Sequence, residues 1–140
     1  STRQNKPLVP NKRRCKGFFL MDLEQLYTLR SSLKDAIRDF FRQNQFSEID
    51  TPILVTAPGT EVHLSYFDTS WETYNKTKQP LWLRSSPELH MKRALCRGLK
   101  KIFQVAPCFR NHGELSQWHH PEFTMLEWYE TGLNYEGLME

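Results

Sequence analysis

The chain has 140 residues, of which 39% are hydrophobic and 25% are charged, and its formal net charge is +3 at pH 7. This length and composition predict one soluble globular domain that is large enough to bury a sizeable core. No run of about 18 apolar residues and no signal-peptide core occurs, which excludes a membrane-spanning protein. Three distant cysteines without a CxxC pair, Cys15, Cys96 and Cys108, favour a reducing, cytoplasmic location over a disulfide frame or a zinc site.

The N-terminal stretch is basic. Residues 1–21 carry six basic and no acidic side chains, and Pro7, Pro10 and Gly17 lie among them. We predict a flexible basic arm over 1–17 in front of a folded domain over 18–140. Such an arm either contacts nucleic acid or an acidic partner, or it is a solvated leader without a partner; the sequence leaves both interpretations open.

A long amphipathic helix is predicted from Asp22 to Asn44, with Asp22 as its N-cap. Apolar side chains recur at steps of three and four residues along it: Leu23, Leu26, Leu29, Leu33, Ile37 and Phe40. A helix of about 22 residues reaches ~33 Å. In a domain of this size, we expect it to span the molecule or an interface.

Short strands are predicted next. The segment 46–55 reads as a strand that Pro52 interrupts, which indicates a sheet edge or a bulge because proline cannot donate a ladder hydrogen bond. Beside the long helix, this strand is either a dimerisation element or an edge strand of a monomer. Further strands are expected over 62–69 and 81–84, with a polar hairpin tip over 72–80 between them.

A second helix is predicted after the strand that ends at Arg84. Ser86 suits its N-cap, Pro87 its first turn, and Gly98 the C′ position that ends it. Capping alone explains Ser86 and the following Glu88, without any ligand.

The last third of the chain predicts a hairpin of two strands, 102–110 and 122–129, joined by a long polar loop. One face of the second strand carries an aromatic ring, a carboxylate and a phenol: Phe123, Met125, Glu127 and Tyr129. The other face is expected to pack on the interior: Thr124, Leu126 and Trp128. With Arg110 at the loop entrance, the first face suits a charged small molecule. The alternative is a half-buried hairpin whose polar face only meets solvent.

Several common site motifs do not occur in the sequence. There is no GxGxxG or GxxxxGK[ST] phosphate loop, no GxSxG nucleophile elbow and no HExxH zinc motif. His112, His119 and His120 stand at spacings of seven and one, which do not build a standard metal site. We expect these histidines to be hydrogen-bonded surface groups.

Three segments together resemble the class II aminoacyl-tRNA synthetases. FRN at 109–111, followed by HHPEFTMLEWYE at 119–130, is similar to motif 2 of the lysyl type. LRSSPELHMKRAL at 83–95 is similar to the segment upstream of motif 2. FFRQNQFSEIDTPIL at 40–54 is similar to motif 1, whose proline lies at the dimer interface in that family and corresponds to Pro52.

The resemblance covers about Leu26 to Glu140 and is highly specific. It implies an α+β fold, with a partial class II antiparallel sheet flanked by helices, and a homodimer. It implies activation of lysine by ATP, with magnesium, to lysyl-adenylate. Within the family, the segments are most similar to the paralogues that transfer lysine to elongation factor P. The alternative within the enzyme class is a lysyl-tRNA synthetase fragment, with tRNA as acceptor.

For the nucleotide, the resemblance implies that Arg110 holds the α-phosphate of ATP and is the catalytic residue. It implies that Phe123 stacks on adenine and that Asn111, His112 and His120 belong to the ATP-binding set. The guanidinium of Arg110 suits the binding of the α-phosphate because its planar fork matches phosphate oxygens.

For the amino acid, the resemblance implies contacts from Ser86, Glu88, Glu127 and Tyr129. Glu127 is also placed to bind a magnesium ion. The two ammonium groups of lysine call for carboxylates, and Glu88 and Glu127 would supply part of that charge.

The sequence departs from the family pattern in three respects. His112 replaces the family glutamate, with Glu114 as its one substitute after a loop shift, and His120 replaces the family asparagine before the proline. The loop between FRN and HHPEF is one residue longer than usual. Motif 3, with the second catalytic arginine, is missing, so we expect a fragment of a longer enzyme or a truncated relative. The hypothesis from another class is a non-catalytic paralogue that acts as a binding or regulatory module.

Overall fold

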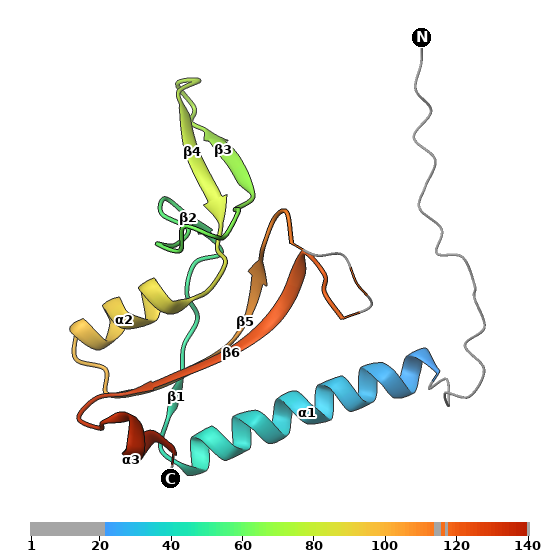
Figure 1. The fold of residues 1–140 in the computed structure, drawn as a ribbon, viewed down its shortest axis with the longest axis vertical. Helices are drawn as coiled ribbons and strands as arrows, with labels where there is room; N and C mark the ends of the chain where they lie inside the picture. The colour runs from blue at the N-terminus through green and yellow to red at the C-terminus, as the bar shows by residue number, and fades with distance from the viewer. Residues whose placement is uncertain (1–21, 114–115, 117, 140) are drawn as a thin grey trace.

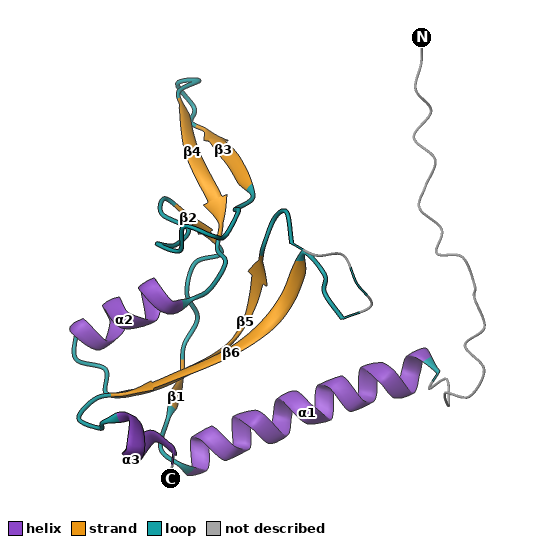
Figure 2. Ribbon diagram, in the orientation of Figure 1, coloured by secondary structure: helices purple, strands orange, loops and turns teal. Residues whose placement is uncertain are grey.

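The computed structural model describes residues 22–113, 116 and 118–139 (Figure 1). Within this part of the chain, helices accompany two three-stranded sheets (Figure 2). The predicted α+β class is confirmed. The predicted basic arm over 1–17 lies outside the described residues.

Helix α1, Leu23–Gln43, forms where the sequence predicts it. Its N-cap is Asp22, whose Oδ1 accepts a hydrogen bond from the backbone N–H of Gln25 at 2.7 Å. In return, Gln25 Oε1 accepts one from the backbone N–H of Asp22 at 3.2 Å. This capping box satisfies two backbone donors that the helix end would otherwise leave unpaired.

The first sheet has the order β1-β5-β6, with β1 at Ser47–Glu48, β5 at Lys101–Phe109 and β6 at Glu122–Glu130. β1 runs parallel to β5, and β5 pairs antiparallel with β6 along its whole length. The predicted hairpin is therefore confirmed. Helix α1 joins this sheet through Phe41, whose ring stacks on that of Phe103 with 4.6 Å between the ring centroids.

The second sheet has the order β2-β4-β3, with β2 at Leu54–Val55, β4 at Lys78–Leu83 and β3 at Asp68–Glu72. All of its pairings are antiparallel. The strand predicted over 62–69 is wrong for most of its length, because β3 begins only at Asp68. Val62 is 88% exposed in an irregular segment, so it offers no face for a sheet to bury.

The hairpin tip between β3 and β4 is shorter than the predicted 72–80. The turn is closed by a hydrogen bond from Thr73 N to Thr77 O at 2.9 Å, and the strands occupy the rest. Pro80 lies within β4, opposite Ser70 of β3. A proline fits there because β2 pairs only with the last two residues of β4 and leaves the other edge at Pro80 without a ladder.

The single strand predicted over 46–55 is also wrong, because its two ends belong to different sheets as β1 and β2. Pro52 lies exposed in the irregular segment between them. The physical reason is that the carbonyls of this segment accept hydrogen bonds from Arg84. Thr51 O accepts from its guanidinium at 2.7 Å and Ile53 O from its backbone N–H at 3.0 Å.

Helix α2, Glu88–Cys96, starts one residue later than the predicted helix. Pro87 occupies the N-cap position, and the hydroxyl of Ser86 accepts a hydrogen bond from the backbone N–H of Glu88 at 3.0 Å. The helix ends just before Gly98, whose φ of +103° suits the C′ position.

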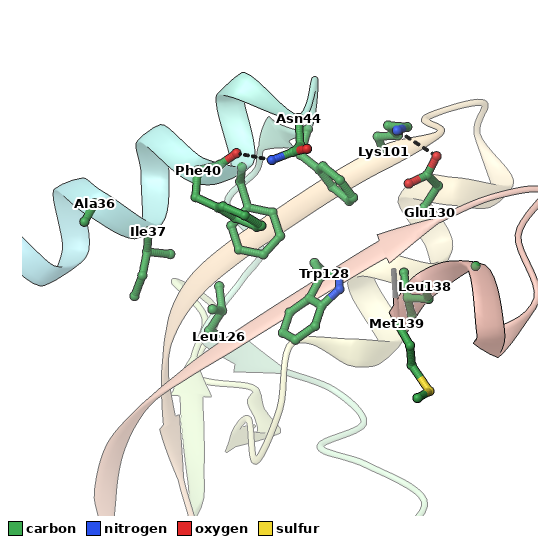
Figure 3. Close-up of a pocket in the computed structure, with 13 residues that line it drawn as sticks. Ala36, Ile37, Phe40, Asn44, Lys101, Leu126, Trp128, Glu130, Leu138 and Met139 are labelled. Atoms are coloured by element: carbon green, nitrogen blue, oxygen red, sulfur yellow. Dashed lines mark hydrogen bonds and ion pairs between the residues drawn. The ribbon is translucent and has the colours of Figure 1, made fainter.

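An apolar groove, which we call the α1 groove, separates α1 from one face of β6 (Figure 3). It has two parts of ≈ 740 and ≈ 620 Å³, and the short helix α3, Tyr135–Met139, borders the second. Thr124, Leu126 and Trp128 face this groove, and Trp128 is 41% exposed. The prediction that they pack on the interior is therefore wrong in part.

Candidate functional site

The opposite face of the β5–β6 hairpin carries the candidate site. The alternation places Phe123, Met125, Glu127 and Tyr129 on one face of β6, as predicted. In the register, Glu127 lies opposite Gln104 and Phe123 opposite Cys108. Gln104 and Cys108 are buried, with exposures of 2% and 0%. We call this surface the site face.

A carboxylate cluster occupies one end of the site face. Ser86 Oγ donates a hydrogen bond to Glu127 Oε1 at 2.5 Å, and Tyr129 Oη donates to Glu127 Oε2 at 2.9 Å. Burial, together with the hydrogen bond to Glu127, raises the pKa of Tyr129. Tyr129 therefore stays protonated at physiological pH and remains a donor. Each carboxylate oxygen keeps acceptor capacity for a further donor such as an ammonium group.

Glu88 lies at the start of α2, next to Ser86, but its carboxylate faces along the helix. Lys92 Nζ donates to Glu88 Oε1 at 2.6 Å, an i,i+4 pair on a half-exposed surface. Lys92 uses one carboxylate oxygen of Glu88, so the predicted use of Glu88 together with Glu127 in one lysine pocket stays a prediction. Lys92 was missed in the sequence, although the spacing alone could have identified it.

Arg110 occupies the other end of the site face, where β5 ends. Its backbone N–H donates to Pro121 O at 2.9 Å, which closes the hairpin at this point. The guanidinium carbon lies 5.1 Å from the centroid of the Phe123 ring, a cation–π arrangement. Arg110 Nε is buried and has no hydrogen-bond partner among the described residues. An unpaired buried donor is costly. The predicted role of Arg110 in holding a phosphate stays a prediction, to which the planar guanidinium is suited.

A cavity of ≈ 650 Å³ opens beside Arg110 and takes in the residues predicted to bind the nucleotide. It is lined by Arg110, Asn111, His112, His120 and Phe123, among others. This volume is within the range typical of small-molecule sites. The structure therefore brings the predicted nucleotide set together at one cavity. Glu114, the proposed substitute carboxylate, lies outside the described residues.

The two unusual histidines differ in their local structure. His112 has a φ of +54°, in the left-handed region, and its backbone N–H donates to Asn111 Oδ1 at 2.9 Å. His120 Nδ1 accepts a hydrogen bond from the backbone N–H of Glu122 at 3.2 Å, at the start of β6. One ring nitrogen of His120 is thus used by the main chain, and the other remains for a ligand.

The described residues contain no group of three or more His, Cys, Asp or Glu side chains that could hold a metal ion. The magnesium role of Glu127 therefore stays a prediction. Its donor chemistry suits the ion, because Mg²⁺ in nucleotide sites is held by one or two carboxylates, phosphate oxygens and water. His119 is hydrogen-bonded to Ser116 Oγ at 2.8 Å, as expected of a surface histidine.

Sequence reasoning missed the polar residues behind the site face: Arg84 and Gln104, which are buried, and Thr51, which is partly buried. Arg84 is 1% exposed and Gln104 is 2% exposed. A possible signal for Arg84 is its position directly after the apolar run LWL and before the SSP turn, where a solvated arginine is unexpected. None of the described helices is both long and apolar enough to traverse a membrane.

Comparison with known proteins identifies the family. The family model for tRNA synthetases class II (D, K and N) matches residues 10–140. A protein named elongation factor P–(R)-β-lysine ligase from Buchnera aphidicola subsp. Schizaphis graminum is 43% identical over 113 residues, which cover 79% of this chain and 35% of that protein. Proteins of the same name from Vibrio atlanticus and Vibrio parahaemolyticus are each 42% identical, over 79% and 84% of this chain and 34% and 36% of their own lengths.

The chain therefore spans about a third of the length of these curated relatives. The family match extends over nearly the whole sequence and includes the segments that resemble motifs 1 and 2. The chain belongs to the class II tRNA synthetases of the D, K and N group.

Proposed function

We propose that this chain is the motif 1 and motif 2 portion of an ATP-dependent ligase that activates lysine, or its isomer (R)-β-lysine, and transfers it to elongation factor P. The observation that carries the proposal is that a carboxylate cluster and a guanidinium lie on the same face of one sheet. The Glu127 cluster, with Ser86 and Tyr129, suits an ammonium group, and the guanidinium of Arg110, whose Nε has no partner among the described residues, suits a phosphate. The names of the similar proteins support the amino acid and the acceptor.

The nucleotide end would work by positioning and charge neutralisation. Arg110 lines the cavity and would donate to the α-phosphate from its guanidinium, and Phe123 would present its ring to adenine. Asn111, His112 and His120 line the same cavity and would complete the ATP site. Magnesium, when bound near Glu127, would neutralise phosphate charge.

The amino-acid end would orient the substrate. Glu127 would accept a hydrogen bond from a substrate ammonium. Ser86 and Tyr129 would hold the carboxylate of Glu127 in place by donating to its two oxygens. The substrate carboxylate oxygen attacks the α-phosphorus, the bond to the β,γ-phosphates breaks, and lysyl-adenylate and pyrophosphate form. An amine of the acceptor then attacks the acyl carbon and AMP leaves. Holding both reactants at a fixed spacing would lower the barrier by making their encounter intramolecular.

We further propose that the protein acts as a homodimer. Apolar side chains of α1 are more than half exposed, with Leu29 at 55% and Leu33 at 58%. Ile53 and Leu54, beside Pro52, are 39% and 51% exposed. Such surfaces are typical of interaction sites. Light scattering of the purified protein measures the oligomeric state directly, and a monomer at all concentrations would reject this part of the proposal.

The test of the proposed function is calorimetric binding of non-hydrolysable adenylate analogues to the protein expressed over its whole reading frame. We expect lysyl or β-lysyl analogues to bind and alanyl and aspartyl analogues not to bind. Arg110→Ala should weaken binding by about 1.5–3 kcal/mol, the range for a charged hydrogen bond. Tyr129→Phe keeps the ring and removes the donor to Glu127. It should weaken binding of the lysyl analogue and leave ATP binding unchanged.

A second candidate function, a non-catalytic binding module, is favoured by His112 and His120, which replace the family's glutamate and asparagine. It predicts that none of the analogues binds to a demonstrably folded protein. Equal binding of all analogues would reject the lysine assignment. Binding with lysine-dependent transfer to tRNA, and none to elongation factor P, would favour the lysyl-tRNA synthetase alternative.

A further inference from the structure

Arg84 is a buried cation that the site description leaves unexplained. It follows β4 and precedes the Ser86 segment, and it is 1% exposed. In the described part of the chain, no carboxylate forms an ion pair with it. Burial lowers the pKa of Arg84. A buried guanidinium without a carboxylate partner is costly and persists where fixed dipoles satisfy it.

The dipoles around Arg84 come from two separate segments. Its Nε donates to Pro107 O at 3.0 Å, near the end of β5. Its Nη1 donates to Thr51 O at 2.7 Å and to Thr51 Oγ1 at 2.6 Å, with Pro52 O at 3.3 Å. The planar fork of one side chain therefore joins the irregular segment at Pro52 to the strand that leads to Arg110.

The backbone of Arg84 joins the same two segments. Its N–H donates to Ile53 O at 3.0 Å, and its carbonyl accepts from Phe109 N at 3.0 Å. Phe109 directly precedes Arg110, and Ser86 stands two residues after Arg84 in the chain. The backbone of Arg84 is therefore hydrogen-bonded next to Arg110, at one end of the site, and lies two residues before Ser86, at the other end.

The contacts continue to the carboxylate cluster. Thr51 Oγ1, which accepts from Arg84, donates to Gln104 Oε1 at 2.9 Å. Gln104 lies opposite Glu127 in the β5–β6 register. The hydrogen-bonded series Arg84–Thr51–Gln104, whose first and last members are buried, therefore supports the strand position opposite Glu127. Side-chain hydrogen-bond networks in a buried setting rigidify a core.

We propose that Arg84 is a positioning residue whose fork sets the spacing between the Glu127 end and the Arg110 end of the site. The inference rests on the proposed function, because the spacing matters only if an amino acid and a phosphate react across this face. Arg84 touches no substrate in this scheme; it acts through Thr51, Pro107 and Phe109. A displacement of one end by about 1 Å is enough to cost a hundredfold in rate.

The experiment compares Arg84→Lys and Arg84→Met with the wild type over the whole reading frame. Lysine keeps the charge but cannot reach both carbonyls as a fork, and methionine keeps an apolar stem and removes all donors. Arg97→Met is the matched control, because Arg97 is exposed at the end of α2. The rate measured is that of ATP–pyrophosphate exchange that depends on the amino acid. It is divided by the number of active sites, which is counted from the amount of adenylate formed.

We expect kcat per titrated site to fall about tenfold to a hundredfold in both Arg84 variants, with KM for the amino acid within about threefold of the wild type. Arg97→Met should change neither value. Counting titrated sites removes the effect of any unfolded fraction, so a merely structural role leaves kcat unchanged. A kcat within about threefold of the wild type in Arg84→Lys would overturn the proposal, and this variant decides the case if Arg84→Met does not fold.

Hydrogen exchange provides a readout that does not require activity. The amides of Arg84 and Phe109 should exchange at least about tenfold faster in both Arg84 variants, while those of α1 keep their wild-type rates. Uniformly faster exchange, or no change at these amides, would overturn the positioning role. An inactive wild type with this local change would reject the proposed function but keep Arg84 as the residue that spaces the two segments.

Discussion

The two faces of the β5–β6 hairpin differ in how completely this chain covers them. On the site face, Gln104 and Cys108 are buried, and Gln104 and Glu127 are hydrogen-bonded to neighbouring side chains. On the opposite face, the α1 groove leaves Leu29 and Trp128 55% and 41% exposed. Figure 3 shows α1 side chains facing Leu126 and Trp128 across this groove. Behind the site face, polar and apolar side chains of this chain are buried. On the α1 face, the described contacts between helix and sheet gather at Phe41, whose ring meets those of Phe103 and Trp128, with a further hydrogen bond from Arg30 to Thr124.

This difference separates two kinds of stabilisation. Behind the site, directional bonds from Arg84 and Thr51 fix the spacing of the functional groups, which is what a site that positions reactants requires. On the α1 face, the buried apolar contact lies at the C-terminal end of the helix, at Phe41, and polar contacts of Arg30 with Thr124 and of Arg38 with Glu48 accompany it. We therefore expect substitutions on the two faces to have different consequences, which can be measured.

The largest loss of stability should come from Phe41→Ala, which removes the aromatic contacts of α1 with Phe103 and Trp128 of the sheet. Phe41 is 5% exposed and also packs edge-on against Phe46, at 5.2 Å between centroids. We expect the free energy of unfolding to fall by about 3–5 kcal/mol, measured by urea denaturation. Phe40→Ala is the matched control, since Phe40 is the preceding residue of the same helix and is 60% exposed.

Phe40→Ala should cost about 1 kcal/mol or less, because its ring loses mainly an edge contact with Phe41. Similar costs at the two positions would contradict the view that Phe41 supplies most of the buried apolar contact between α1 and the sheet.

A smaller change in the free energy of unfolding is expected when the pH is raised, because of the buried Cys108 thiol on the site face. Burial raises the pKa of Cys108 to about 11, above its ordinary value of 9.0, with Glu127 adding to the rise and Arg84 and Arg110 opposing it. At pH values between these two pKa values, the unfolded chain releases a thiol proton that the folded chain keeps. The free energy of unfolding therefore decreases as pH rises. We expect a contribution on the order of 1 kcal/mol between pH 8 and 10.5.

The comparison of wild type with Cys108→Ala isolates this contribution, because Tyr129, whose pKa is also raised, is common to both proteins. Cys96→Ala is the control, since Cys96 is exposed. An equally steep pH dependence in Cys108→Ala would show that the thiol does not contribute and that the site face is more open than the structure indicates.

The sequence predicted the elements that have strong local signals. The helix capped by Asp22 and the hairpin around Phe123 and Glu127 follow from periodicity and alternation, and both form as expected. The segment around Pro52 was not predictable, because its path depends on a buried guanidinium more than 30 residues away in the chain. For the site, alternation along β6 placed Glu127 and Tyr129 on one face, but no local rule links Arg84 to Gln104 through Thr51.

The smallest effect is expected on the open face, from Leu29→Gln. Leu29 borders the ≈ 740 Å³ part of the α1 groove and already meets solvent, so an isosteric polar side chain should change the free energy of unfolding of the 140-residue chain by no more than about 0.5 kcal/mol. The same substitution in the protein expressed over its whole reading frame sharpens the comparison. If another part of the protein or a second subunit covers the groove there, the cost should rise to about 1.5–3 kcal/mol, the value for burying a leucine side chain. A loss above about 2 kcal/mol in the 140-residue chain itself would contradict the open face, because an exposed leucine has little hydrophobic free energy to lose.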